Sequence, residues 1–349
     1  MRLEELTKIV RRRRLDQVLV ANEANIRALT GITCDNAILV VSRLSSPVLY
    51  TDFRYIPMVH RVAPTLTVRD IKRFGKRTGR GCPHPRRIGY ESSIPHAKFL
   101  SWQKKFPRAT FVDISKDLAA IRAVKTPDEI AALRAAEKLN CEIWETARGR
   151  FKAGMTERQM ARIIQKLMIE RGEGEAFATI VCVGKNAAEC HHEPDDTVWN
   201  GREPVLVDMG VRLNGVCSDL TRNLLPPSSV SRLPSLYRKV YALVLKANLA
   251  AIAAAKPGMT GRQLDKVARD VIKKGGFGKC FGHSLGHGVG YEIHEEPYAS
   301  KKGDRVLKPG MLVTIEPGIY LEDNLGVRIE DLVLVTETGC EVLSASAEK

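Results

Sequence analysis

Five residues in the second half of the chain are of types that could hold metal ions and support hydrolysis: Asp208, Asp219, His287, Glu316 and Glu330. Four carboxylates in one pocket would repel one another strongly unless cations neutralised them. Two divalent ions would balance the four negative charges, and oxygen ligands with a single nitrogen favour Mn²⁺, Fe²⁺ or Co²⁺ over a thiolate-type zinc site. A metal pair that shares a water would also provide a nucleophile at neutral pH.

The two aspartates lie on either side of a predicted β-hairpin. Asn214-Gly215 separates two apolar runs, which is the strongest short sequence signal for a two-residue hairpin loop. This loop places Asp208 opposite Thr221 and leaves Asp219 on the face of Asp208, with Cβ atoms about 7 Å apart. Because a register shift of one residue would put the aspartates on opposite faces, an ordinary hairpin with two solvent-facing aspartates stays open.

The two glutamates lie in a second pair of apolar runs, residues 312–316 and 327–335. A glutamate in a buried strand needs a partner or a metal ion, because its charge is costly to remove from water. A strand register that brings Glu316 opposite Glu330 is geometrically possible, although the sequence does not impose it.

The histidines form a third group of candidate residues. His283, His287 and His294 lie within twelve residues, separated by glycines that disfavour a helix and allow close approach to a ligand. The segment is therefore not the HExxH helix of a zinc peptidase, and a structural role for these histidines stays open. A polar loop before the first hairpin carries His191 and His192, as surface residues or as part of the site.

The elements that must position these residues divide the chain into two parts. Residues 1–122 alternate between helical segments and short apolar runs at 17–21, 37–41 and 86–90, which predicts an α/β domain. A helix is predicted to begin after Thr126, with Pro127 at its first position. We place the domain boundary just before this helix.

An internal repeat organises the second part, residues 123–349. Residues 154–159 (GMTERQ) recur as residues 258–263 (GMTGRQ), and both copies carry the T-x-x-Q pattern of a capping box before an amphipathic helix. Two copies of one unit predict an α+β domain with a pseudo-two-fold internal repeat and a site between its halves.

Composition restricts the classes of partner. The 349 residues carry a net charge of +15, with basic residues along the whole chain, which favours a basic solvated surface over a nucleic-acid partner. No apolar run is long enough to span a membrane, and the N-terminus lacks the apolar stretch of a signal peptide. We therefore expect a cytoplasmic protein with reduced cysteines and with neither a nucleic acid nor a membrane as partner.

Several long motifs, in order, resemble the creatinase/aminopeptidase superfamily with the pita-bread fold, and within it the Xaa-Pro peptidases, aminopeptidase P and prolidase. The stretches that resemble the creatinase-like N-terminal domain are 19–33, 50–55 and 88–93, and those that resemble the catalytic motifs are 207–222, 282–297, 307–320 and 326–335. The resemblance implies a creatinase-like domain over residues 1–122 and a pita-bread metallopeptidase domain over residues 123–349.

The resemblance also implies a role for each matched residue. The ligands of two divalent ions, Mn²⁺ before Co²⁺ or Fe²⁺, would be Asp208, Asp219, His287, Glu316 and Glu330. Glu316 would also accept a proton from the metal-bridging water, His294 would stabilise the tetrahedral intermediate and His191 would lie against the substrate. The residues that would support the ligands and the bridging solvent are Arg328, Tyr320, His283 and Thr221, and Arg328 is also expected to take part in catalysis.

The reaction implied is hydrolysis, by a metal-bridging hydroxide, of the bond between an N-terminal residue and a proline in second position, in a homodimer. Tyr298 stands where prolidases of similar size often carry an arginine for the carboxylate of a dipeptide, which favours an Xaa-Pro aminopeptidase over an Xaa-Pro dipeptidase. Cys190 and Asn223 replace the family's usual proline and threonine at positions not expected to touch a ligand.

Three further alternatives belong to other classes. A non-catalytic pita-bread binding module and a metal-free creatinase-like hydrolase are disfavoured by the complete ligand set. A methionine aminopeptidase shares that ligand set but generally lacks the N-terminal domain.

Overall fold

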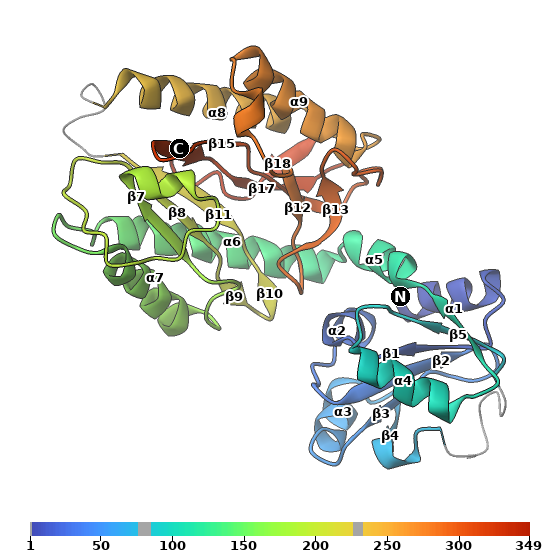
Figure 1. Ribbon diagram of the computed structural model, residues 1–349. Coiled ribbons are helices and arrows are strands. Elements are labelled where there is room, and N and C mark those ends of the chain that lie inside the picture. The colour runs from blue at the N-terminus through green and yellow to red at the C-terminus, as the bar shows by residue number, and fades with distance from the viewer. Residues whose placement is uncertain (1, 76–84, 226–232) are drawn as a thin grey trace. The chain divides into compact units, whose positions relative to one another are not determined.

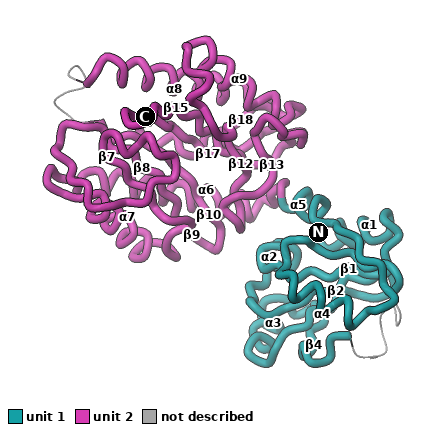
Figure 2. The backbone as a smooth tube through the Cα atoms, viewed as in Figure 1, with its two compact units in different colours: residues 1–122 teal, residues 123–349 magenta. Residues whose placement is uncertain are grey.

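The computed structural model describes residues 2–75, 85–225 and 233–349, which form two compact units (Figures 1 and 2). Unit 1 comprises residues 1–122 and unit 2 comprises residues 123–349. Each unit has its own hydrophobic core, and every candidate site residue belongs to unit 2.

Unit 1 is a six-stranded sheet with the strand order β4-β3-β2-β1-β5-β6, in which β1 is parallel to β5 and antiparallel to β2. The strands are β1 (Gln17–Val20), β2 (Ala37–Ser42), β3 (Val48–Thr51), β4 (Thr67–Asp70), β5 (Arg87–Tyr90) and β6 (Thr110–Asp113). The described helices are α1 (Arg2–Arg12), α2 (Glu23–Thr30), α3 (Ile56–Val62), α4 (His96–Lys105) and α5 (Ser115–Ala123), together with the 3₁₀ turn η1 (Ile71–Arg73). The three apolar runs form β1, β2 and β5, which confirms the α/β class predicted for this part.

Unit 2 combines long helices with short antiparallel sheets. Its helices are α6 (Pro127–Arg148), α7 (Glu157–Arg171), α8 (Ser235–Ala254) and α9 (Gly261–Lys274), with 3₁₀ turns η2 (Gly184–Ala188) and η4 (Gly278–Cys280). Its first strands are β7 (Ile180–Val183), β8 (Val205–Met209), β9 (Arg212–Leu213), β10 (Val216–Cys217) and β11 (Leu220–Leu224). The later strands are β12 (Gly286–Gly288), β13 (Glu295–Ala299), β14 (Leu312–Ile315), β15 (Gly318–Leu321), β16 (Leu325–Arg328), β17 (Asp331–Val335) and β18 (Cys340–Val342).

Helix α6 begins where the sequence predicts it. The Thr126 hydroxyl accepts a hydrogen bond from the Glu129 amide at 3.3 Å, and the Glu129 carboxylate accepts one from the Thr126 amide at 2.8 Å. This reciprocal capping box satisfies two backbone donors that the first helical turn would otherwise leave free. The helix then packs beneath β9, β10 and β11, the strands of the aspartate hairpin (Figure 1).

The internal repeat is visible as two matching sets of backbone hydrogen bonds. Thr156 and Thr260 both cap their helices, α7 and α9, through capping boxes with the glutamine three residues later. The Gly154 amide donates to the Trp199 carbonyl at 2.8 Å, and the Gly258 amide donates to the Leu307 carbonyl at 3.0 Å. The same local structure thus recurs in both halves, which confirms the predicted pseudo-two-fold organisation.

Two further observations concern the whole described chain. Its seven cysteines other than Cys82 are all free thiols, and Cys82 lies outside the described residues. Among the described helices, none combines the length and the apolar composition needed to cross a membrane.

Candidate metal centre

The aspartate hairpin has the register expected from its Asn-Gly loop. Val216 pairs with Leu213 next to the loop, and Thr221 pairs with Asp208 further along. Asn214 and Gly215 have φ angles of 52° and 67°, the positive values that a type I′ turn requires at both central positions. The prediction that Asp208 lies opposite Thr221 is therefore confirmed.

The strands of this hairpin are interrupted at the level of Asp219, where the sequence predicts continuous strands. A Cβ atom on Gly210 would lie 2.3 Å from the Ser218 carbonyl oxygen, so the two chains approach too closely for a side chain there. The Ser218 hydroxyl instead bonds the Val211 amide at 2.8 Å and the Val211 carbonyl at 3.0 Å. The resulting kink separates β9 and β10 from β8 and β11.

Glu316 and Glu330 lie at matching positions between two strand ladders of the same register. Ile315 pairs with Asp331 on one side of them, and Gly318 pairs with Arg328 on the other. The Glu330 amide donates to the Thr221 carbonyl at 3.2 Å, which joins this strand pair to the aspartate hairpin. The register that was possible from the sequence is thus the one that the fold adopts.

All five predicted ligand side chains converge on one point in unit 2. Carboxylate oxygens of Asp208, Asp219 and Glu330 lie within 4.8 Å of one another. The His287 Nε2 atom lies 3.4 Å from Glu316 Oε1 and 3.6 Å from Asp219 Oδ2. Residues up to 122 positions apart in the sequence therefore form one cluster of four carboxylates and one imidazole.

The buried carboxylates of this cluster are costly to ionise unless positive charge is added beside them. Burial, and then the charge of neighbouring carboxylates, raises the pKa of Asp219 and of Glu330 well above the usual range, and raises the pKa of Glu316 to about 8. Burial lowers the pKa of His287 to about 4, which keeps its imidazole neutral and able to bind a cation. Asp208 Oδ1 is buried without a hydrogen-bond partner among the described residues. A deprotonated cluster of this composition fits divalent cations.

Arg328 holds one side of the cluster through three neighbours. Its guanidinium donates to Asp208 Oδ2 at 2.6 Å, to the Thr221 hydroxyl at 3.1 Å and to the Tyr320 hydroxyl at 2.8 Å. The Thr221 hydroxyl in turn donates to Glu330 Oε2 at 2.8 Å. The Tyr320 hydroxyl lies 3.0 Å from His283 Nε2. The four residues expected to support the ligands therefore form one continuous hydrogen-bond network.

Two residues that the sequence did not single out, Thr314 and Glu137, also belong to this site. The Thr314 hydroxyl accepts from the His287 amide at 3.0 Å and donates to Glu316 Oε1 at 3.1 Å, so one side chain orients two candidate ligands. Buried Glu137 of α6 accepts from the Asp219 amide at 3.1 Å. Thr314 lies two residues before Glu316 and therefore on the same face of an extended chain, so the sequence could have identified it. No sequence pattern identifies Glu137.

Cys190 lies beside the hydrogen-bond network that supports the ligands. Its Sγ atom is 3.9 Å from Arg328 Nη1, and so it contacts a residue that holds Asp208 in place. Asn223, the other departure from the family pattern, donates to the Arg328 carbonyl at 2.6 Å. Both departures therefore lie against Arg328.

The remaining two histidines border the cluster. The ring of His294 stands edge-on to that of His287, with centroids 4.3 Å apart. Burial lowers the pKa of His294, and the nearby His191 lowers it further. His191 is exposed, so it borders the site on the solvent side.

The loop that carries His191 is anchored from behind by its neighbour His192. Glu157, fully buried at the start of α7, accepts hydrogen bonds from the His192 ring at 2.7 Å, the Val183 amide at 2.6 Å and the Asp195 amide at 3.1 Å. Gly261 stands at the matching position of the second repeat, where a Cβ atom would lie 2.0 Å from the Tyr298 carbonyl oxygen. The repeat thus diverges at Glu157, a residue that helps to fix the histidine loop.

Replacing Glu157 by glutamine is expected to destabilise unit 2 by about 1–3 kcal/mol. The NH₂ group of the glutamine would face the hydrogen-bond donors that now bind the Glu157 carboxylate. Urea unfolding followed by tryptophan fluorescence would measure the change. Glu170→Gln, an exposed glutamate on the same helix, is the matched control and should change stability by less than about 0.5 kcal/mol. Equal stability of the two variants would show that Glu157 does not anchor the loop.

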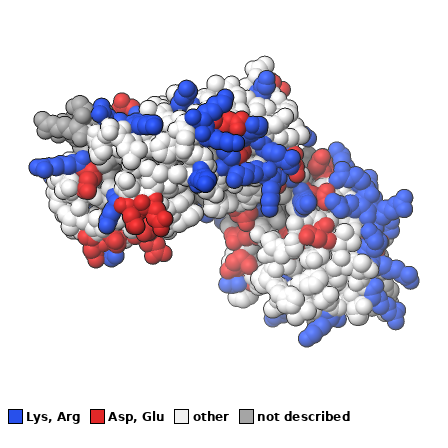
Figure 3. All heavy atoms as spheres, turned by 45° about the horizontal axis from the view of Figure 1, so that its top comes forward, with Lys and Arg blue, Asp and Glu red and all other residues white. Residues whose placement is uncertain are grey.

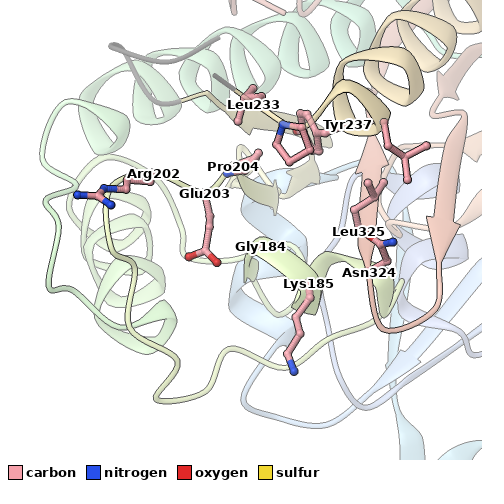
Figure 4. A pocket seen from close by; sticks show the side chains of 11 residues that line it. Gly184, Lys185, Arg202, Glu203, Pro204, Leu233, Tyr237, Asn324 and Leu325 are labelled. Carbon is pink, nitrogen blue, oxygen red and sulfur yellow. The ribbon is translucent and has the colours of Figure 1, made fainter. Parts of the chain in front are cut away.

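A cavity of about 880 Å³ lies elsewhere in unit 2, where the turn between β15 and β16 approaches the start of α8 (Figure 4). Polar and apolar side chains line it, including Lys185, Glu203, Tyr237 and Leu325. None of the five candidate ligands contributes to its wall, so this cavity is distinct from the carboxylate cluster.

Fold and site together define a metal-dependent hydrolase, and the sequence comparisons specify the family. Residues 131–337 match the model of metallopeptidase family M24, and residues 2–124 match that of the creatinase/prolidase N-terminal domain. The chain belongs to metallopeptidase family M24. The creatinase-like first domain and the pita-bread second domain expected from the sequence are thereby confirmed.

Similar proteins of known structure or name extend this result. An Xaa-Pro dipeptidase of Pyrococcus furiosus is 42% identical over 192 residues, which cover 55% of this chain and 54% of that protein. The solved prolidase from Pyrococcus furiosus has a TM-score of 0.88 at 32% identity and covers 97% of this chain and 98% of its own. The X-Pro aminopeptidase from Thermotoga maritima has a TM-score of 0.84 at 30% identity, covering 99% and 97%.

Proposed function

We propose that this protein hydrolyses the peptide bond between an N-terminal residue and a proline, and that dipeptides are its preferred substrates. The observation that carries the proposal is the buried cluster of Asp208, Asp219, His287, Glu316 and Glu330. Similarity to proteins named Xaa-Pro dipeptidase and prolidase supports the substrate class and favours the dipeptidase over the aminopeptidase. This preference reverses the inference drawn from Tyr298, an exposed residue of β13.

The five clustered residues are the proposed ligands of two divalent ions. Bound divalent ions supply Lewis-acid activation of the scissile carbonyl and of the attacking water. We propose Mn²⁺ as the native ion, because oxygen donors with one imidazole suit it, with Co²⁺ and Fe²⁺ as alternatives. The homodimer and the cytoplasmic location expected from the sequence stay predictions, and light scattering of the purified protein would test the first.

The side chains around the cluster supply the remaining steps. Glu316, oriented by Thr314, receives the proton of the attacking water at its carboxylate and passes it to the prolyl nitrogen. His294 donates to the oxygen that becomes negatively charged as the carbonyl is attacked, and exposed His191 contacts the substrate. The prolyl nitrogen carries no hydrogen, so substrate binding cannot depend on a donor there. Arg328 keeps Asp208 and Thr221 in place throughout.

A panel of four peptides tests this proposal. With metal-stripped enzyme reloaded with Mn²⁺, we expect cleavage of Ala-Pro at a kcat/KM at least about tenfold above that of Ala-Pro-Ala, and no cleavage of Ala-Ala or Met-Ala. Preferred cleavage of the tripeptide would make the protein an Xaa-Pro aminopeptidase, the function that Tyr298 favours. Cleavage of Met-Ala alone would indicate a methionine aminopeptidase, and no metal-dependent cleavage of any peptide would contradict the proposal.

A further inference from the structure

The positive charge of this protein is concentrated in unit 1. Residues 1–122 contain 24 Lys and Arg against 10 Asp and Glu, a net charge of +14, whereas residues 123–349 contain 31 against 30. The non-catalytic third of the chain thus carries almost all of the net charge of +15. The basic residues occur along the whole chain, but their excess over acidic residues does not, so the charge of unit 1 requires its own explanation.

Many of these charges gather at one end of the unit 1 sheet. Gln17 at the start of β1 pairs with Ser42 at the end of β2 and with Ile88 of β5, and Arg87 pairs with Thr110 of β6. Six exposed arginines, named here the arginine edge, lie in the last turn of α1, at the start of β5 or in the segments next to the strand ends: Arg11, Arg14, Arg43, Arg86, Arg87 and Arg108. Figure 3 shows Lys and Arg side chains along one border of this unit.

The arginine edge has little negative charge to balance it. Asp16 lies at its centre, but one carboxylate oxygen accepts from the amides of Arg86 and Arg87, and the other accepts from the Arg43 guanidinium at 3.3 Å. Within the part of the chain that the structure describes, the other five arginines form no salt bridge with a carboxylate. The Arg87 Nε atom donates to the Arg14 carbonyl at 3.3 Å, but this contact with a neutral group leaves the positive charge of the guanidinium available to an external anion.

Arg14 also occupies a backbone position that disfavours it. Helix α1 ends in a Schellman motif, in which the Leu15 amide donates to the Val10 carbonyl at 2.9 Å and the Arg14 amide to the Arg11 carbonyl at 3.1 Å. Arg14 is the first residue after the helical turn in this motif. Its φ angle is 53°, a left-handed conformation that is usually adopted by glycine at this position. An arginine at this position adds a positive charge but terminates the helix less favourably than glycine would. This indicates that the charge of Arg14 has a role.

We propose that the arginine edge of unit 1 binds the phosphate backbone of double-stranded nucleic acid. Neighbouring strands lie about 4.8 Å apart, so side chains from the ends of β2, β1, β5 and β6 spread over roughly 15 Å. A duplex presents one negative charge per about 1.7 Å of axis, or roughly nine over that length. Arginine forks match phosphate oxygens, and contacts of this kind bind without sequence preference.

Two other polyanions fit the arginine edge less well. Single-stranded nucleic acid is usually bound by stacking its bases on aromatic side chains. The exposed aromatic residue Phe53 follows β3 and therefore lies at the end of the sheet opposite the arginine edge. A membrane surface is usually bound through an amphipathic helix whose apolar side enters the lipid. The apolar side of α1, with Leu6, Ile9 and Val10, is buried in the core of unit 1.

Fluorescence anisotropy with a labelled random-sequence DNA duplex of about 30 base pairs would test this on the full-length protein. The triple variant Arg14→Gly, Arg86→Gln, Arg108→Gln should weaken binding at least about tenfold at 50 mM salt and reduce the log–log salt slope by roughly 2–3. The control with the same loss of charge is Arg162→Gln, Lys246→Gln, Lys256→Gln, three exposed positions of unit 2. It should bind the duplex within about twofold of the parent protein.

Arg14→Gly alone separates binding from folding. We expect this variant to unfold at an equal or higher temperature, since glycine suits the positive φ, while its affinity for the duplex falls about threefold to tenfold. The proposal is overturned if the parent protein does not bind the duplex at 50 mM salt. It is equally overturned if both triple variants lose the same affinity, or if phosphatidylserine vesicles bind to the arginine edge and the duplex does not.

Discussion

Glu316→Gln is expected to lower kcat/KM for Ala-Pro by about 10²–10⁴-fold and to weaken divalent metal binding in the same protein. The substitution removes one carboxylate from the cluster and places an amide near His287 Nε2, which lies 3.4 Å from Glu316 Oε1. It also removes the group proposed to receive the proton of the attacking water. Steady-state kinetics at saturating Mn²⁺, together with calorimetric titration of metal into the stripped protein, would separate the two effects.

The matched control is Glu322→Gln, an exposed glutamate in the turn between β15 and β16 of the same strand pair. It should retain both metal affinity and kcat/KM within about twofold, as is usual for surface substitutions. Full metal affinity in Glu316→Gln with loss of activity alone would restrict Glu316 to proton transfer. Unchanged activity in Glu316→Gln would exclude it from the site.

The second large effect concerns the metal-free protein, whose stability should fall as the pH rises from about 6.5 to 8. The pKa of Glu316 is raised to about 8, and those of Asp219 and Glu330 are raised in the same direction, so the folded state holds protons that the unfolded chain has already lost. Each carboxyl that keeps its proton over this interval contributes roughly 2 kcal/mol of lost stability. The lowered pKa values of His287 and His283 act in the opposite sense, but chiefly below about pH 6.5.

Bound Mn²⁺ should reverse this trend, because deprotonated carboxylates bind the ion and protons compete with it. Urea unfolding of chelator-treated protein at pH 6.5 and 8, with and without added Mn²⁺, would measure both slopes. Glu316→Gln should flatten the slope of the metal-free protein. A metal-free stability that is equal at the two pH values would show that the carboxylates are already ionised and balanced in some other way.

The local structure of the site followed from short-range sequence signals. Asn214-Gly215 determined the hairpin register, because positive φ angles at two successive residues are accessible to few other pairs. The period of two along a strand then put Asp208 and Asp219 on one face. The capping boxes at Thr126, Thr156 and Thr260 likewise determined where α6, α7 and α9 begin, because side chain and backbone satisfy each other within one turn.

The approach of separate segments was decided only by the tertiary structure. The register that sets Glu316 against Glu330 depends on packing over a fourteen-residue separation, and Glu137 reaches the Asp219 amide from a helix 82 residues earlier. The raised pKa values arise from burial, which no local pattern specifies. Cys190 and Thr314 joined the site for the same reason.

The sequence alone shows that unit 1 is basic, but it does not show where the basic side chains gather. Arg11, Arg43, Arg86 and Arg108 lie far apart along the chain, and only the strand order β2-β1-β5-β6 brings their turns to one end of a sheet. Sequence alone thus determined which residue types are present and the local turns and caps that hold them. Tertiary structure decided which of them meet, because long-range contacts depend on the burial of whole apolar faces and not on neighbouring residues.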